Sequence, residues 1–136
     1  MPSISSPEAI IVDAITSKLA AVIDNVLLGY SATGIDNGDQ FPAILVQLDT
    51  LREINRQGSK ARYQFSFIIS VALKTQAETT LELLQYARQV REVFPLNEKL
   101  CPASIKHSLS ETEFDIAPGH SQLSFADITL TVEAIL

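Results

Sequence analysis

Residues 63–73 alternate between apolar side chains and smaller or more polar ones, and this alternation constrains the fold more than any other feature of the sequence. The apolar set occupies every second position: Tyr63, Phe65, Phe67, Ile69, Val71 and Leu73. Because successive side chains of a strand point to opposite faces of a sheet, this period of two predicts a long strand with one buried face. Ile68 and Ala72 stand between the apolar positions, so we expect the second face to be only partly exposed to water.

A polar and mostly basic segment, residues 50–60, connects this strand to an earlier apolar run, and we call this segment the arm. Four of the ten basic residues of the chain lie in the arm or just after it, and only Glu53 opposes them. They are Arg52, Arg56, Lys60 and Arg62. A long hairpin that ends in a charged arm favours a domain that builds contacts over one that carries out chemistry.

The sequence leaves three interpretations of the arm open. The arm is a solvated hairpin tip, or it reaches an acidic surface of a neighbouring protein, or it contacts nucleic acid. In the second case the planar guanidinium groups would form bidentate contacts with carboxylates, while Leu51 and Ile54 would add apolar anchoring. The third case is disfavoured because the arm has no aromatic side chains on which bases could stack.

The remaining apolar patterns predict two helices and several strands. Ser6, Pro7 and Glu8 are typical of a helix start, and the spacing after them predicts a helix to about Leu28 that ends at Gly29. Residues 75–78 fit a capping box that opens a second helix, which Pro95 ends. Its predicted buried side chains are Ala77, Leu81, Leu84, Ala87, Val90 and Phe94. Further strands are expected at residues 41–48, 104–109, 112–116 and 123–136.

This order of elements predicts one α+β domain over residues 1–136. The order is α-β-β-α-β-β with a further strand possible at the end, and consecutive strands are joined by short polar turns. Such connections favour a mainly antiparallel sheet with both helices packed on one face. At this length, a single domain buries roughly two thirds of its unfolded surface.

Composition excludes several classes of protein. The net charge of −6 argues against a general nucleic-acid-binding protein, because a surface that follows phosphates needs an excess of Lys and Arg. Cys101 is the only cysteine, so no internal disulfide can form, and a reducing compartment such as a bacterial cytoplasm is expected. The N-terminus lacks the features of a signal peptide, and no apolar stretch approaches the ~20 residues of a membrane span. The low charged fraction, 19%, indicates a surface that another subunit covers.

No residue pattern predicts a catalytic site, a metal site or a cofactor. His107 and His120 lie in separate contexts, and Cys101 has no second cysteine beside it, whereas a zinc site needs three or four such ligands. A nucleophilic pair of Cys101 and His107 would also need a third group to orient the base, and none stands at a recognisable position. We therefore expect these residues to be ordinary strand or loop positions and the protein not to be an enzyme.

Two other segments are expected to be surface features. Glu111, Glu113 and Asp115 alternate along a predicted strand, which places three acids on one face, and we expect that face to be solvated. The loop at residues 34–38 lacks the glycine spacing of a phosphate-binding loop. It stays a candidate contact site, because binding residues gather on irregular surface loops.

The layout of the chain resembles that of the tail terminator proteins of long-tailed bacteriophages and of Mu-like or lambda-like prophages. The resemblance covers residues 7–136, and its most suggestive parts are the apolar strand at 41–48 before a polar hairpin and the terminal strand at 125–136. It implies an assembly protein without catalytic residues or cofactors. Members of this family form a hexameric ring that caps the tail tube, ends its polymerisation and offers a surface for joining the head, while DNA passes through the central channel.

The resemblance also implies partners and a location. The partners are further copies of this chain, the tail tube protein and the head-joining proteins, with no membrane involved. The location is the host cytoplasm during assembly and the virion tail afterwards. Within this hypothesis we expect Arg52, Arg56, Lys60 and Arg62 to contact the tube or a neighbouring subunit.

Two other functions stay open from the residues alone. One is a small enzyme or ligand-binding domain with a pocket near His107 and Cys101. The other is a regulatory or adaptor domain of a cytoplasmic oligomer that adds a partner peptide to the edge of its sheet, an edge that Pro42 and the arm would mark.

Overall fold

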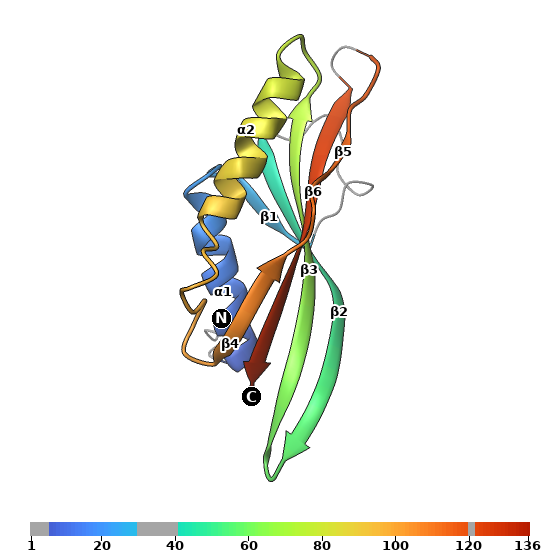
Figure 1. Ribbon diagram of the computed structural model, residues 1–136. Helices are drawn as coiled ribbons and strands as arrows, with labels where there is room; N and C mark the ends of the chain where they lie inside the picture. The colour runs from blue at the N-terminus through green and yellow to red at the C-terminus, as the bar shows by residue number, and fades with distance from the viewer. Residues whose placement is uncertain (1–5, 30–40, 120–121) are drawn as a thin grey trace, which may run out of the picture.

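A long antiparallel hairpin runs from one end of the computed structural model to the other (Figure 1). It consists of β2 (Ala43–Gln57) and β3 (Lys60–Lys74), which a two-residue turn connects. Gly58 in that turn has a φ of 62°, as the tight turns of two-residue hairpins require and as side-chain-bearing residues rarely adopt. The strand predicted at 63–73 is therefore confirmed, and both strands continue through the arm. The described residues are 6–29, 41–119 and 122–136.

The hairpin belongs to a six-stranded mixed sheet with the order β1-β2-β3-β6-β4. The last strand, β6, is antiparallel to β3 over thirteen residue pairs, from Arg62↔Ile135 to Lys74↔Leu123. β4 and β5 pair one after the other with the far edge of β6, whereas β1 runs parallel to the start of β2. The α+β class and the mainly antiparallel sheet are thus confirmed. Besides β2 and β3, the strands are β1 (Val26–Leu28), which was not predicted, and β4 (Ser104–Leu109), β5 (Glu113–Asp115) and β6 (Leu123–Ile135), which were.

Both helices, α1 (Pro7–Ala20) and α2 (Thr79–Glu92), pack on the same face of this sheet (Figure 1). One hydrophobic cluster joins them to alternate side chains of the central strands, as the period of two predicts. Its members include Ile11, Ile15 and Leu19 of α1; Leu83, Ala87 and Val90 of α2; Phe65, Phe67, Ile69 and Val71 of β3; and Ile128, Leu130 and Val132 of β6. Neither helix is long and apolar enough to cross a membrane.

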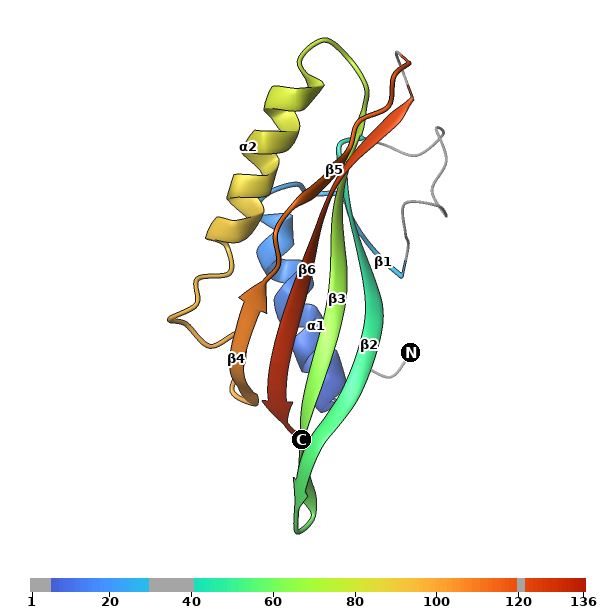
Figure 2. The same cartoon turned by 45° about the vertical axis from the view of Figure 1, so that its right-hand side comes forward.

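The second face of the sheet has no helix over it among the described residues (Figure 2). We call it the open face. Near β1 it carries a small buried cluster of Ala43, Leu45, Ala72 and Phe125. Further along the strands it is polar and half-buried, with Ser66 on β3 opposite Thr131 on β6. The expectation of a partly exposed second face is therefore confirmed.

The first helix is shorter than predicted. It ends at Ala20, and the predicted continuation to Leu28 is wrong because residues 26–28 form β1 instead. These three residues gain backbone pairing with Ile44–Val46, which an unsupported last helical turn would not provide. Helical and strand spacing are hard to distinguish in so short an apolar run. The predicted start is confirmed, since the Ser6 hydroxyl accepts a hydrogen bond from Ala9 N at 3.1 Å.

The second helix starts later than predicted and has a different buried side. Thr75 is not its cap: its backbone N–H donates to Gln122 O and its side chain meets that of Ser124, which continues the pairing of β3 with β6. The helix begins at Thr79, so the buried side comprises Thr79, Leu83, Ala87 and Val90, while Leu81 and Leu84 are exposed. Only the second half of the predicted stripe is correct.

We expect the contact of α1 with the sheet to contribute strongly to stability. Ile15 is fully buried, so Ile15→Ala should lower the free energy of unfolding by about 2–5 kcal/mol, through lost burial and the cavity left behind. Ile10 lies on the same helix but is 48% exposed, and Ile10→Ala should stay within about 0.5 kcal/mol of the parent. Urea denaturation of both variants measures the difference, and equal losses would contradict the packing described.

Candidate interaction surface

The arm is a two-stranded projection without a core of its own. Every residue from Gln47 to Lys60 is exposed, whereas the preceding four residues of β2 are buried. In Figure 1 its tip extends past the ends of β4 and β6. β1 pairs with β2 only as far as Val46, so the outer edge of β2 beyond it has no strand partner within the described ranges. The arm therefore offers both side chains and unpaired backbone groups to a partner.

The basic residues of the arm differ in whether an acidic side chain neutralises their charge. Arg56 pairs with Glu53 at 2.9 Å, which neutralises it locally. Arg52 donates to the neutral Gln64 side chain at 2.6 Å and keeps its net charge. Lys60, next to the turn, has no ion pair with any residue the structure describes. Arg52 and Lys60 are thus the two cations of the arm that are available to an acidic partner.

Arg62 belongs to a different group of charges, on the open face of the sheet. Its guanidinium contacts Glu133 Oε1 at 2.8 Å, and Lys106 on β4 lies 3.4 Å from Glu133 Oε2. This carboxylate therefore links β3, β6 and β4. The structure brings Arg62 next to Glu133 and Lys106, so an acid neutralises its charge, unlike that of Arg52 or Lys60.

Exposed apolar side chains accompany the free cations. Leu48, Leu51 and Ile54 are 51%, 53% and 40% exposed. Leu51 and Ile54 were expected to anchor the arm, but the sequence placed Leu48 inside a buried strand. Leu48 is still paired with the buried Phe67, so the alternation is intact at that position. The two bulges of β2, at Leu48/Thr50 and Glu53/Asn55, shift the alternation only in the residues beyond.

The acidic residues Glu111, Glu113 and Asp115 lie at the other end of the sheet from the arm. All three are exposed, which confirms a solvated position, but the strand is shorter than predicted and includes only Glu113 and Asp115. Glu113 stands opposite Asp127 on β6, and Asp127 Oδ1 is buried without a hydrogen-bond partner in the part of the chain described. This end of the sheet is therefore strongly acidic.

The residues weighed for chemistry are buried. Cys101 and His107 are 8% and 7% exposed, and His107 Nε2 lies 3.0 Å from Pro95 O. Ser104 Oγ donates to Cys101 O, so these residues stabilise the connection before β4. Within the described ranges, no three His, Cys, Asp or Glu side chains are grouped as a metal site would need. His120 and the loop at 34–38 lie outside the described residues.

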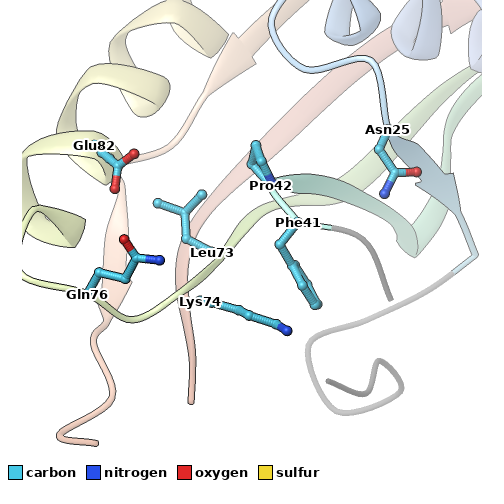
Figure 3. Close-up of a pocket in the computed structure, with 7 residues that line it drawn as sticks. All are labelled: Asn25, Phe41, Pro42, Leu73, Lys74, Gln76 and Glu82. Carbon is cyan, nitrogen blue, oxygen red and sulfur yellow. The ribbon is translucent and has the colours of Figure 1, made fainter. Parts of the chain in front are cut away.

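A cavity of about 520 Å³ lies between the start of β2, the end of β3 and α2 (Figure 3). Figure 3 shows Gln76 and Glu82 on one side and Phe41 with Lys74 on the other. Lys74 Nζ lies 5.9 Å from the centre of the Phe41 ring, a cation–π contact. The lining mixes single charges with apolar side chains and shows no arrangement that would select one ligand. The arm and the two sheet edges are therefore the better candidates for a functional surface.

Comparison with known proteins shows a shared fold and no sequence relative. A scan against models of protein families and a search of curated proteins find no match. Among solved structures, a chain in the virion of a native gene transfer agent particle is similar to this chain, with a TM-score of 0.60 at 12% identity. The match covers 96% of this chain and 96% of that chain. The likeness therefore extends over the whole fold and is not confined to a common supersecondary motif.

We expect the charges around Glu133 to make stability depend on pH. Partial burial raises the pKa of Glu133, but Arg62 and Lys106 together lower it more, so its pKa lies below the usual 4.5. A lowered pKa stabilises the fold above the usual value, and that contribution is lost as the pH falls through the folded-state pKa.

Glu133→Gln should therefore lower the free energy of unfolding by about 1 kcal/mol at neutral pH, and the difference from the parent should shrink in acid. Urea denaturation at a series of pH values measures this. Glu92→Gln, on an exposed position of α2, is the control. A difference that stays constant down to pH 3 would contradict the assignment.

Proposed function

We propose that this chain is a structural protein of a phage-like particle, which assembles into a ring at the end of a tail tube. The observation that carries the proposal is the fold shared over 96% of the chain with a chain of a gene transfer agent virion. The resemblance to tail terminator proteins supports the finer role, in which the ring ends tube polymerisation and provides the surface for head joining. The same resemblance leads us to expect six copies in the ring, with DNA passing through its centre.

The shape of the chain supports self-assembly. Among the described residues, its sheet has two different edges without a strand partner, the outer edge of β2 beyond Val46 on one side and β4 with β5 on the other. A contact between two different surfaces of identical copies repeats around an axis, and it produces a closed ring when the rotation closes. Both helices cover one face, so in such a ring the open face, which no helix of the described residues covers, would line the channel.

The arm supports a docking role. It carries the free cations Arg52 and Lys60 together with exposed Leu51 and Ile54, and the exposed Leu48 lies just before it. Apolar anchors beside charges are the usual composition of a protein interface, and the charges mainly set the rate of association and the choice of partner. A tube end or a neighbouring subunit with exposed carboxylates fits this surface.

A second candidate function is that of an adaptor that adds a peptide strand to its sheet. The unpaired edge of β2 over residues 47–57 favours it, since such an edge can bind an extended peptide through backbone hydrogen bonds. It predicts that the protein binds a partner peptide without forming a ring on a tail tube, whereas the assembly role predicts a ring built from contacts between copies.

Light scattering after size-exclusion chromatography, with and without a candidate tail tube protein, separates the two functions. A ring, either free or on the tube, supports the assembly role. A protein that stays monomeric even with the tube protein would overturn it. A genomic neighbourhood of tail tube genes provides a second, independent check.

Reversing the free charges of the arm should weaken docking without unfolding the protein. In Arg52→Glu/Lys60→Glu, each change affects an exposed side chain, so stability should change by no more than about 0.5 kcal/mol per site. Binding to the tube or to further copies should fall, and it should fall most at low salt, where charges are least screened.

The matched control is Arg88→Glu/Lys99→Glu, which makes the same change of charge at exposed positions outside the arm. Sedimentation with tube protein at several salt concentrations measures binding. If both pairs behave alike at every salt concentration, the arm is only a solvated hairpin tip.

A further inference from the structure

The outer edge of β5 has polar and apolar side chains on opposite faces of the sheet. Phe114 lies opposite Ala126, a member of the cluster beneath the helices, so its side chain is on the helix side. Because successive side chains of a strand alternate, Glu113 and Asp115 are on the open face. No strand of the described ranges pairs with this edge, so its outward backbone groups are open to a further strand.

The helix side of this edge carries exposed apolar side chains from two elements. Phe114 and Ile116 are each 42% exposed, and Leu84 of α2 is 51% exposed. Arg91 donates to Thr112 Oγ1 at 3.1 Å, which shows the side of α2 that faces this edge. α2 runs down the sheet while β4 and β5 run up it (Figure 1). Leu84 lies on the same side about two turns before Arg91, or ~10 Å, a distance that about three strand residues cover, so it is level with Phe114.

The open-face side of the edge is acidic. Glu113 and Asp115 are exposed, and Asp127 beside them has an Oδ1 that is buried without a hydrogen-bond partner in the part of the chain described. On this face, the described base closest to them in the strand register is Lys74, which lies two strands away on β3. The two arginines of α2 lie on the helix side of the sheet. The carboxylates at this edge therefore have no base beside them on their own face.

Charge disfavours a further copy of this chain as the occupant of the edge. Two β5 edges side by side would place carboxylates opposite carboxylates, which is destabilising. The β2 edge is no better match, because Asp49 and Glu53 balance its two arginines over residues 47–57. A strand with Lys or Arg at every second position and aliphatic residues between them fits both faces. Its bases would meet Glu113 and Asp115, and its aliphatic side chains would cover Phe114 and its apolar neighbours.

We infer that the outer edge of β5 binds an extended segment of a partner protein in which basic and aliphatic residues alternate. The segment adds to the sheet through backbone hydrogen bonds, and the two faces of the edge select its side chains. The inference goes beyond the proposed ring and does not depend on it. The arm and this edge lie at opposite ends of the long hairpin, so one copy can hold a different partner at each end (Figure 1).

Synthetic peptides test the inference. Lys-Val-Lys-Val-Lys-Val-Lys with blocked ends has the alternation, whereas Val-Val-Val-Lys-Lys-Lys-Lys has the same composition and charge without it. Fluorescence anisotropy of labelled peptides should show that the alternating peptide binds about tenfold or more tightly than the rearranged one. In its complex, hydrogen exchange should slow in residues 111–116 and stay unchanged in residues 47–57 of the β2 edge.

Charge reversal shows whether the carboxylates select the peptide. Glu113→Lys/Asp115→Lys should weaken binding about tenfold or more, because bases would then face the bases of the peptide. The matched control is Asp13→Lys/Glu98→Lys, which makes the same change of net charge at exposed positions outside β5. Because charges at a distance are screened by salt, the control should keep binding within about threefold.

Truncation shows whether the apolar face contributes. Phe114→Ala should weaken binding of the alternating peptide severalfold, because an aliphatic side chain of the peptide loses its contact. Leu96→Ala is the control, since Leu96 is 70% exposed and lies outside β5. It should leave binding unchanged.

Three results would overturn the inference. They are equal binding of the two peptides, equal effects of the two charge reversals, and slowed exchange at residues 47–57 in place of residues 111–116. Each of them leaves the proposed ring standing, because none of these measurements concerns contacts between copies. A ring that fails to form would in turn leave the peptide site standing.

Discussion

The central position of β3 is the constraint on which the rest of the structure depends. This strand is paired on both sides, with β2 from Lys60 to Ala72 and with β6 from Arg62 to Lys74. Its alternate side chains, from Phe65 to Leu73, form the floor on which both helices pack. Because a one-residue slip would turn all of these side chains to the open face, the helix layer fixes the register of the sheet. The arm is the part of the β2–β3 pairing that extends beyond the hydrophobic core.

Sequence alone recovered the elements whose pattern is strong and local. The alternation at 63–73 and at 123–136 gave β3 and β6 within a few residues, and the Ser6–Pro7 start gave α1. The errors share one physical cause, namely that pairing with a distant segment decides the local structure. Residues 26–28 became a strand because Ile44–Val46 lies beside them, and Thr75 stayed in the sheet because Gln122 and Ser124 lie opposite.

The surface could be predicted in composition but not in detail. Four basic residues near the hairpin tip are visible in the sequence, but which of them are free depends on side chains elsewhere. Glu133, far away in the sequence, forms a salt bridge with Arg62, while Glu53 forms one with Arg56. The acids lie at the end of the sheet opposite to the arm because of the order in which β4 and β5 pair with β6. The spacing of residues along the sequence does not predict that order.

The continuity of β3 from the arm to the start of α2 has a mechanical consequence. A force applied at the tip along the strand acts on all thirteen pairs with β6 in parallel, in shear, and does not open them one after another. Ladders loaded in this way resist extension better than ladders that are peeled from one end. A pull on the tip is thus shared along the whole length of the β3–β6 ladder.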